Sequence, residues 1–415
     1  MKNKPRIRFK GFAEDWEQRE LAELCNVYDG THQTPRYTNS GVMFVSVENI
    51  KTLESDKYIS EDDFKNEFKI FPEFGDILLT RIGDVGSANI ILDNIKRAYY
   101  VSLALLKPKG INSLFLLALL SSASVQSEIW KRTLHIAFPK KINKNEISKV
   151  IVSKPSILEQ KKIGELIYAL DQIITLHQRK LEKLKLAKKA LLQKLFPKNG
   201  SKFPELRFNG FADAWEQCKL GEIFEYLQNN TLSRDSLNYK NPNIKNIHYG
   251  DILVKFDEIL DGSNKDIPYI NSELDLSKFS KSLLQDGDII FSDTAEDDTV
   301  GKAIELKNVN APFILSGLHT IPCRPLIPFG KGYLGNFLNS DSYRVQLRPL
   351  VQGIKVSSIS KSALKDTMIE YPKNLDEQEK IGSLFQNVAK MITLHQRKLD
   401  KLQEVKKGLL QKMFV

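Results

Sequence analysis

Two short stretches have residue types and spacing that chemistry could use. GKGYLG (Gly330–Gly335) fits the G-x-G-x-x-G pattern of a phosphate-binding loop, and DTAEDD (Asp293–Asp298) is a carboxylate cluster of the kind that holds Mg²⁺. The first follows the proline-rich RPLIPF instead of a strand, so we expect a loop that leads into a helix. The sequence has no Walker motif, no Asn-Pro-Pro-aromatic motif of amino-methyltransferases and no nucleophile arrangement around its histidines. These residues favour a binding protein without a metal site or catalysis of its own.

Other polar residues suit the reading of base edges. Arg and Lys match guanine edges and phosphates, Asn and Gln match adenine, and Ser and Thr match either. They gather in turn-rich stretches such as THQTPRYTNSG (31–41), SRDSLNYKNPNIKNIHYGD (233–251) and LVQGIKVSSISKS (350–362). The residues predicted to contact DNA are Thr34, Arg36, Tyr37, Arg81, Arg97, Tyr99, Arg234, Asn246, His248, Tyr249, Gln352, Lys355 and Ser357. Each one taken alone is also typical of an ordinary surface.

The elements that must position these residues come from an internal duplication. PRIRFKGFAEDWEQRELAEL (5–24) returns as PELRFNGFADAWEQCKLGEI (204–223), and about 23 of 38 positions from Glu159 to Phe196 match those from Glu377 to Phe414. Between these closely matched segments lie two blocks, roughly 26–140 and 225–357, that match only in patches. We interpret the matched segments as sharing one structural role while the blocks face different ligands; ordinary divergence of loops is the alternative.

The duplicated 38-residue segments are predicted to be long helices. Their apolar residues recur at intervals of three and four, a capping-box spacing begins the first at Ser156, and Pro197 ends it. Such a helix is roughly 57 Å long and needs a partner for its single apolar stripe. The order of segments along the chain predicts that the two helices pair antiparallel, with a block at each end.

The octapeptide ITLHQRKL occurs in both helices and contains the midpoint of the first. In an antiparallel pair each copy would meet the other, so we predict that His177, His395, Leu181 and Leu399 form the core at the centre. Histidines on the apolar stripe are best explained as polar core residues that fix the register. Metal binding or catalysis is disfavoured because no other ligand types cluster nearby.

Composition limits the class of protein. The 415 residues suit two domains, and 41% of them are apolar, enough for packed cores. Three cysteines without disulfide or metal-ligand spacing, no signal peptide and no long apolar run favour the cytoplasm. The net charge is +10, of which +6 lies in 159–198 and +3 in 376–415, so the blocks are almost balanced. The charge permits a nucleic-acid partner without establishing one.

The chain resembles the specificity subunit of type I restriction–modification enzymes. The resemblance rests on the doubled RFxGFAxxWEQ openings, on the doubled EQxKIG…ITLHQRKL helices, and on GDILLTRIGDVG and ILSGLHTIP within the blocks. It implies an α+β fold: two mixed α/β target recognition domains in a pseudo-two-fold arrangement, separated by an antiparallel coiled coil. The expected boundaries are 1–157 and 198–374 for the domains, and 158–197 and 375–415 for the helices.

The resemblance also implies a function. Each recognition domain would read one half of a bipartite site in double-stranded DNA, and the helix pair would set the spacing and dock adenine methyltransferase subunits. ATP-dependent restriction subunits would join for cleavage, and S-adenosylmethionine, ATP and Mg²⁺ would belong to those partners, with none on this chain. The alternatives are a scaffold that spaces two protein-binding domains and, less favoured, a stand-alone nuclease or methylase.

Overall fold

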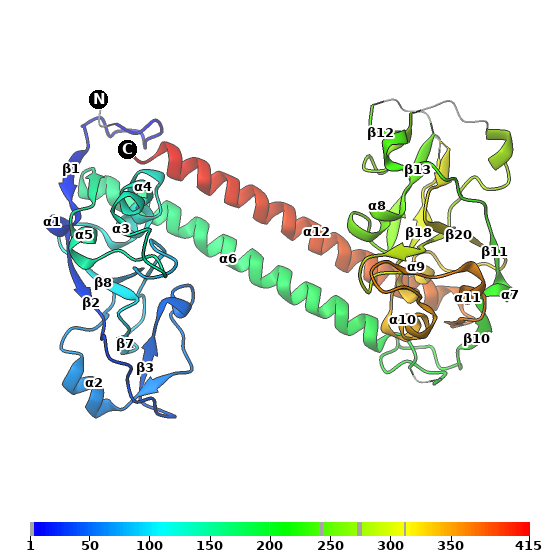
Figure 1. Ribbon diagram of the computed structural model, residues 1–415, viewed down its shortest axis with the longest axis horizontal. Coiled ribbons are helices and arrows are strands. Elements are labelled where there is room, and N and C mark those ends of the chain that lie inside the picture. Colours follow the sequence, from blue (N-terminus) through cyan, green and yellow to red (C-terminus); the bar gives the residue numbers. More distant parts are fainter. Residues whose placement is uncertain (1–3, 199, 241–243, 272–275, 311–312) are drawn as a thin grey trace. The chain divides into compact units, whose positions relative to one another are not determined.

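The computed structural model describes residues 4–198, 200–240, 244–271, 276–310 and 313–415. The chain divides into two compact units. Unit 1 is Met1–Arg179 with Gln396–Val415, and unit 2 is Lys180–His395. Each unit therefore combines one mixed block with one end of each of the two long helices, α6 (Ile157–Lys194) and α12 (Leu375–Lys412) (Figure 1). The predicted α+β class is confirmed.

Unit 1 is built on two small sheets. The larger is antiparallel, in the order β2 (Cys25–Asp29), β8 (Leu103–Pro108), β5 (Ile77–Thr80) and β6 (Ala88–Ile90), and the smaller is β4 (Tyr58–Ile59), β3 (Val42–Val45) and β7 (Arg97–Tyr99). The helices are α1 (Leu21–Leu24), α2 (Glu61–Glu67), α3 (Ser113–Leu120), α4 (Ala123–Arg132) and α5 (Lys144–Ser148). A further ribbon pairs β1 (Glu17–Glu20) with β9 (Ile151–Lys154), which leads directly into α6.

Unit 2 repeats this plan with longer connections. Its main sheet has the order β11 (Phe224–Tyr226), β20 (Thr320–Pro325), β16 (Ile289–Ser292), β18 (Ala303–Lys307) and β14 (Ile259–Asp261). Its second sheet is β12 (Leu237–Asn238), β15 (Tyr269–Ile270), β13 (Lys245–Ile247) and β19 (Ile314–Ser316). The helices are α7 (Leu220–Ile223), α8 (Tyr249–Val254), α9 (Tyr333–Phe337), α10 (Asp341–Leu347) and α11 (Lys361–Lys365), and β10 (Glu216–Lys219) pairs with β22 (Met368–Tyr371) before α12.

The helix ends pack antiparallel within each unit, as predicted. In unit 1 the beginning of α6, with Ile163 and Ile167, shares a core with Met413 and Phe414 at the end of α12. In unit 2 the end of α6 shares a core with Ile381 and Phe385 near the beginning of α12. Both helices stop about two residues before the predicted end, because the next two side chains leave the helix and enter a core. These side chains are Leu195 and Phe196 in unit 2 and Met413 and Phe414 in unit 1.

An aromatic cluster surrounds each of these entering phenylalanines. Phe414 lies against Trp16 and Phe115 with ring centroids 6.1 and 5.7 Å away. Phe196 lies against Trp215 at 6.3 Å and against Phe385 at 6.0 Å. The tryptophan of each duplicated opening segment is thus a core residue whose position explains why the segment is repeated.

A buried ion pair joins each opening segment to the start of a long helix. Arg8 donates to both carboxylate oxygens of Glu159 at 2.7 Å, and Glu159 is fully buried. Arg207 and Glu377 make the equivalent pair at 2.7 and 2.9 Å. The pairing raises the pKa of both guanidinium groups. A bidentate Arg–carboxylate pair fixes direction as well as distance, so each pair sets the angle between block and helix.

An amide and a glycine complete the contact between each block and its long helix. We call this contact, made by the Arg–Glu pair, the glutamine and the glycine, the joint. Gln160 accepts the backbone N–H of Asn112, and Gln378 accepts that of Gly330, in both cases just before a block helix. One turn later comes a glycine. A Cβ on Gly164 would lie 2.5 Å from the backbone nitrogen of Phe115, and one on Gly382 would lie 2.2 Å from the carbonyl oxygen of Lys331. The doubled EQxKIG motif therefore clamps each block to its helix.

The residues predicted for the centre of the helix pair fall in both units. His395 is buried, His177 is half-buried, and Leu181 and Leu399 are each 6% exposed. The contact between the histidines, the pseudo-two-fold relation and the domain boundaries stay predictions. Within the part of the chain that the structure describes, no single helix is long and apolar enough to cross a membrane. The bent pair of α3 and α4 has the length and composition of a membrane span, on those two criteria alone.

The buried Arg–Glu pair of the joint predicts a large loss of stability when one of its two charges is removed. Arg207→Ala leaves the Glu377 carboxylate, 1% exposed, without its cation, and we expect the unfolding free energy of unit 2 to fall by about 3 kcal/mol. The matched control Glu205→Gln breaks the exposed pair with Lys194, and should cost less than about 1 kcal/mol. Denaturant unfolding followed by tryptophan fluorescence measures both. Equal losses would show that the buried pair does not hold the joint.

Candidate nucleic-acid interface

Each block carries a hairpin at the same place in its fold, between its last two short helices. Hairpin 1 (134–141) joins α4 to α5, and Leu134 donates its N–H to Lys141 at 2.8 Å. Lys141 also forms a bridge with Ile82, beyond the end of β5. The N–H of Ile142 then donates to the carbonyl of Arg81 at 2.9 Å. The hairpin base is therefore braced by the central sheet of its block.

Hairpin 2 (352–358) is braced in the same way in unit 2. Gln352 and Ser358 exchange backbone hydrogen bonds of 2.9 and 2.8 Å. β21 (Ser357–Ser358) pairs with β17 (Thr294–Ala295), which follows β16. The N–H of Ile359 donates to the carbonyl of Asp293 at 2.8 Å, the counterpart of the Ile142–Arg81 bond. Three of the predicted DNA-contacting residues lie on this hairpin: Gln352, Lys355 and Ser357.

Hairpin 1 was not among the residues predicted from the sequence. Its sequence LHIAFPKK combines large apolar residues with two lysines in a loop. That combination was a usable signal, because apolar residues without helical or strand periodicity, next to cations, are not explained by a core. Hydrogen-bonding side chains alone do not identify such a loop.

Some predicted residues of unit 1 are accessible. Thr34, Arg36 and Tyr37 are exposed in the loop after β2, where the Tyr37 ring lies 5.7 Å from Phe44 and carries the ammonium of Lys57 at 5.6 Å from its centroid. Their side chains are accessible to a ligand.

The other three residues predicted in unit 1 are buried. Arg97 is 2% exposed and donates to the Leu53 carbonyl at 3.0 Å and to Asp93 at 2.6 and 2.8 Å. Arg81 pairs with Asp29, whose carbonyl accepts the Tyr99 hydroxyl at 3.0 Å. A buried guanidinium needs such partners. Supporting the block therefore fits these side chains better than contacting bases, and a sequence alone does not show which arginine finds an internal carboxylate.

The residues predicted in unit 2 are likewise partly buried and partly accessible. Asn246 is fully buried, and its side-chain amide oxygen accepts from the side-chain amide of Asn230 at 2.6 Å, so it too holds the block together. Arg234 is half-exposed, pairs with Asp251 and donates to the Tyr239 hydroxyl at 2.9 Å. Gln352 and Lys355 are exposed, and Ser357 is half-buried.

His248 and Tyr249 belong to an aromatic and polar cluster beside β17. The rings of His248 and Tyr249 lie 4.6 Å apart, and Tyr249 meets His319 edge-on at 5.2 Å. His319 in turn lies 3.3 Å from both Asp293 and Thr294. Burial lowers the pKa of His248, whose Nδ1 accepts the N–H of Gly250, so this ring is neutral at physiological pH.

His319, which is not among the residues predicted from the sequence to contact DNA, has the left-handed backbone that non-glycine residues adopt mainly at constrained sites. It joins His248, Tyr249 and the Asp293–Thr294 segment that braces hairpin 2. His319 is exposed and Tyr249 is half-buried, so these two rings present stacking faces and hydrogen-bonding groups of the kind that nucleobases need, whereas His248 is buried.

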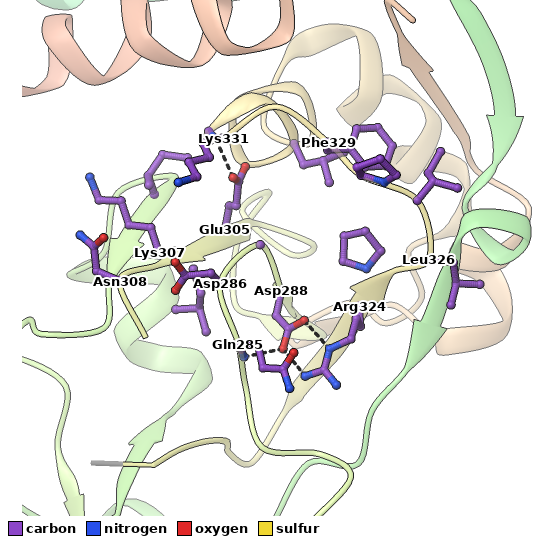
Figure 2. Close-up of a pocket in the computed structure, with 18 of the residues that line it drawn as sticks. Gln285, Asp286, Asp288, Glu305, Lys307, Asn308, Arg324, Leu326, Phe329 and Lys331 are labelled. Carbon is purple, nitrogen blue, oxygen red and sulfur yellow. Dashed lines mark hydrogen bonds and ion pairs between the residues drawn. The ribbon is translucent and has the colours of Figure 1, made fainter. Parts of the chain in front are cut away.

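The glycine-rich loop borders a pocket of about 650 Å³ in unit 2 (Figure 2). Figure 2 shows Glu305 pointing toward the loop that carries Lys331, and Asp288 joined to Arg324. Glu305 accepts the N–H groups of Gly332 at 2.6 Å and Gly335 at 2.8 Å. An internal carboxylate thus occupies the position that a phosphate would take in a nucleotide site. The loop leads into α9, as expected from the sequence.

Two carboxylates of the acidic stretch 293–298 contact neighbouring residues of the chain. Asp293 contacts Thr294 and His319, and Asp297 accepts the N–H of Thr299 at 2.9 Å. Among the residues with described positions, no group of three or more His, Cys, Asp or Glu is arranged to hold a metal ion.

Comparisons with known proteins agree on one family. A family model described as the type I restriction modification DNA specificity domain matches residues 13–186 and 212–404. The type I restriction enzyme MjaVIII specificity subunit of Methanocaldococcus jannaschii is 23% identical over 283 residues, which cover 65% of this chain and 62% of that protein. The putative MjaX specificity subunit of the same organism is 24% identical over 221 residues, covering 51% of this chain and 48% of that one. The chain thus matches less than two thirds of the length of each relative.

A solved structure shares the fold. The S subunit of a type I restriction–modification system from M. genitalium aligns with a TM-score of 0.62 over 99% of both chains, at 13% sequence identity. The folding pattern is therefore shared along the whole chain although few residues are identical.

Glu305 predicts a pH dependence of stability. Burial raises its pKa from 4.5 to about 7, so the folded state holds this proton more tightly than the unfolded state. Stability should therefore fall as pH rises from 4.5 to about 7, by up to about 3 kcal/mol, and Glu305→Gln should abolish this part of the slope. Gln386→Ala, a non-titrating change in the same pocket, should leave the slope unchanged. Denaturant unfolding at several pH values measures it; an unaltered slope in Glu305→Gln would refute the assignment.

Proposed function

Because the chain belongs to the family of type I restriction modification DNA specificity domains, we propose that it is the specificity subunit of such a system and reads a bipartite DNA site. The observation that carries this proposal is the contrast between joints and blocks. The joints are the same in both units, down to the Arg–Glu pair, the Gln hydrogen bond and the close-packed glycine. The blocks they hold present different side chains, as two unlike half-sites require.

The exposed parts of the hairpins and neighbouring loops are the proposed DNA-contacting surface. In unit 1 this surface is hairpin 1 with Thr34, Arg36 and Tyr37, and in unit 2 it is hairpin 2 with Tyr249, His319 and Arg234. Each block would read one half-site, with exposed cations on phosphates and polar or aromatic groups on base edges. Arg81, Arg97, Tyr99 and Asn246 support these surfaces from within.

The outer faces of the long helices are the proposed docking sites for two copies of a methyltransferase subunit. Ile173 and Leu176 on α6 are 43% and 64% exposed, and their counterparts Met391 and Leu394 on α12 are 41% and 51% exposed. Apolar residues three positions apart share a helix face, and a repeated apolar face suits two identical partners. S-adenosylmethionine, and ATP and Mg²⁺ for cleavage, would be held by partner subunits, while this chain supplies recognition without catalysis.

Selection from a random duplex pool tests the reading function. The chain, purified with a partner adenine methyltransferase subunit, should enrich one motif split by a fixed gap, and exchanging residues 26–140 for those of a relative should change one half of that motif. Sequencing of the bound duplexes is the measurement. Absence of any enriched motif at low and physiological salt would instead favour a scaffold that spaces protein partners.

Charge substitution tests the docking faces separately. Leu176→Asp and Leu394→Asp should each reduce the assembly from two methyltransferase copies to one, and together to none, because a carboxylate opposes burial in an apolar contact. Native mass spectrometry counts the copies. Ile70→Asp, a 40% exposed apolar position on block 1, is the matched control and should retain both. Two copies bound to the double variant would exclude these faces.

A further inference from the structure

The tips of both hairpins carry apolar side chains that touch nothing else in the protein. Ile136 and Phe138 on hairpin 1 are 100% and 103% exposed, and Ile354 on hairpin 2 is 102% exposed. Exposed apolar residues are common, but they usually rest part of their surface on neighbours. Full extension into water at the equivalent hairpin of both blocks indicates that these side chains are buried by a ligand.

The base of each hairpin is fixed to its block. Each base is paired to the strand extension beyond β5 or β16, as described above. In unit 1 the Trp130 ring also lies 4.1 Å from that of His135, and the Lys140 ammonium lies 4.8 Å from its centroid. The paired backbone at the base of each hairpin loses little further freedom on binding, so more of the gain from burying the tip side chain is available for affinity.

The charge around the tips fits a polyanion. Residues 130–141 contain four basic residues and no acidic one, and residues 348–361 contain three basic residues and no acidic one. The carboxylates nearest to them are engaged. Glu128 and Glu146 pair with Lys131 and Arg132 in unit 1. In unit 2 the Asp293 carboxylate contacts Thr294 and His319, and the Asp297 carboxylate accepts the N–H of Thr299. Lys140, Lys141 and Lys355 extend from the hairpins beside the apolar tips.

We propose that Phe138 and Ile354 are wedges that insert between neighbouring base pairs of the half-site their block reads, while hairpin lysines contact the flanking phosphates. The proposal rests on the proposed function. Proteins that insert an apolar side chain into a base step unstack it partly and kink the duplex. The two wedges would thereby loosen the stack near the adenine that a partner enzyme must extrude before it can methylate it.

A protein partner fits these tips less well. Identical partner subunits require like surfaces in both units, as the joints and the apolar helix faces are. The hairpins are unlike, LHIAFPKK against QGIKVSS, and their tips are Phe in one and Ile in the other. Unlike tips suit two different half-sites, since the ease of unstacking depends on the base step.

The test uses the full chain in complex with its methyltransferase and a duplex of the selected motif, with 2-aminopurine placed stepwise through each half-site. Binding of the wild-type complex should raise the 2-aminopurine fluorescence at one step per half-site. Phe138→Ala should abolish the rise in the half-site of block 1 only, Ile354→Ala in that of block 2 only, and each should weaken binding about tenfold. Phe138→Leu should restore most of both effects.

Matched controls are exposed apolar residues elsewhere in each unit. Phe74→Ala, 65% exposed, and Val254→Ala, 85% exposed, should leave fluorescence and affinity unchanged. Wild-type affinity and fluorescence in Phe138→Ala and Ile354→Ala would overturn the wedges while leaving the proposed reading function intact. Loss of the methyltransferase from either variant without DNA would overturn them in favour of a protein contact. Failure of the wild-type complex to select any motif is the separate result that refutes the reading function itself.

Discussion

The buried Arg–Glu pair of each joint is the interaction on which the rest of the structure depends. Arg8 lies 151 positions before Glu159, and Arg207 lies 170 positions before Glu377, so each pair closes a whole block onto the helix that follows it. A neutral contact would hold the same surfaces together but leave rotation free. Two parallel hydrogen bonds in a desolvated place fix one direction. Sequence changes within a block can then alter the ligand it binds without changing how the block is attached to its helix.

The remaining parts of the joint explain why the two copies of the duplicated segments are so alike. The glutamine accepts a backbone N–H from the block, and the glycine one turn later lets that backbone approach the helix more closely than any side chain allows. Replacing the glycine would force the block away from the helix, and replacing the glutamine would leave a buried N–H unsatisfied. The pattern EQxKIG therefore occurs twice because the same contact between block and helix is made in both units.

The long helices, their antiparallel packing in each unit and the mixed blocks were predictable, because periodicity and duplication are local signals that a single sequence displays. The pairing of Arg8 with Glu159 was not, since nothing in either residue's neighbourhood names a partner so far away. The same limit affected the candidate site. From residue type alone, Arg97 and Arg36 are equally good DNA ligands. In the structure Arg97 is buried and pairs with Asp93, whereas Arg36 is exposed. The glycine-rich loop is a further case: its pattern is real, but the group that its N–H donors bind is the carboxyl of the chain's own Glu305.

Unit 1 is discontinuous along the chain, and this has a consequence for how the protein is made. Met413 and Phe414 complete the core around Trp16 and Phe115, yet they are synthesised after all of unit 2. At a ribosomal rate of about 5–20 residues per second, roughly 10–50 s separate the first block from its last core residues. Unit 2, which is continuous, can close its core first. Until Met413 and Phe414 are synthesised, the apolar side chains of the nascent first block that pack against them stay uncovered. A chaperone that covers them until translation ends would favour correct folding.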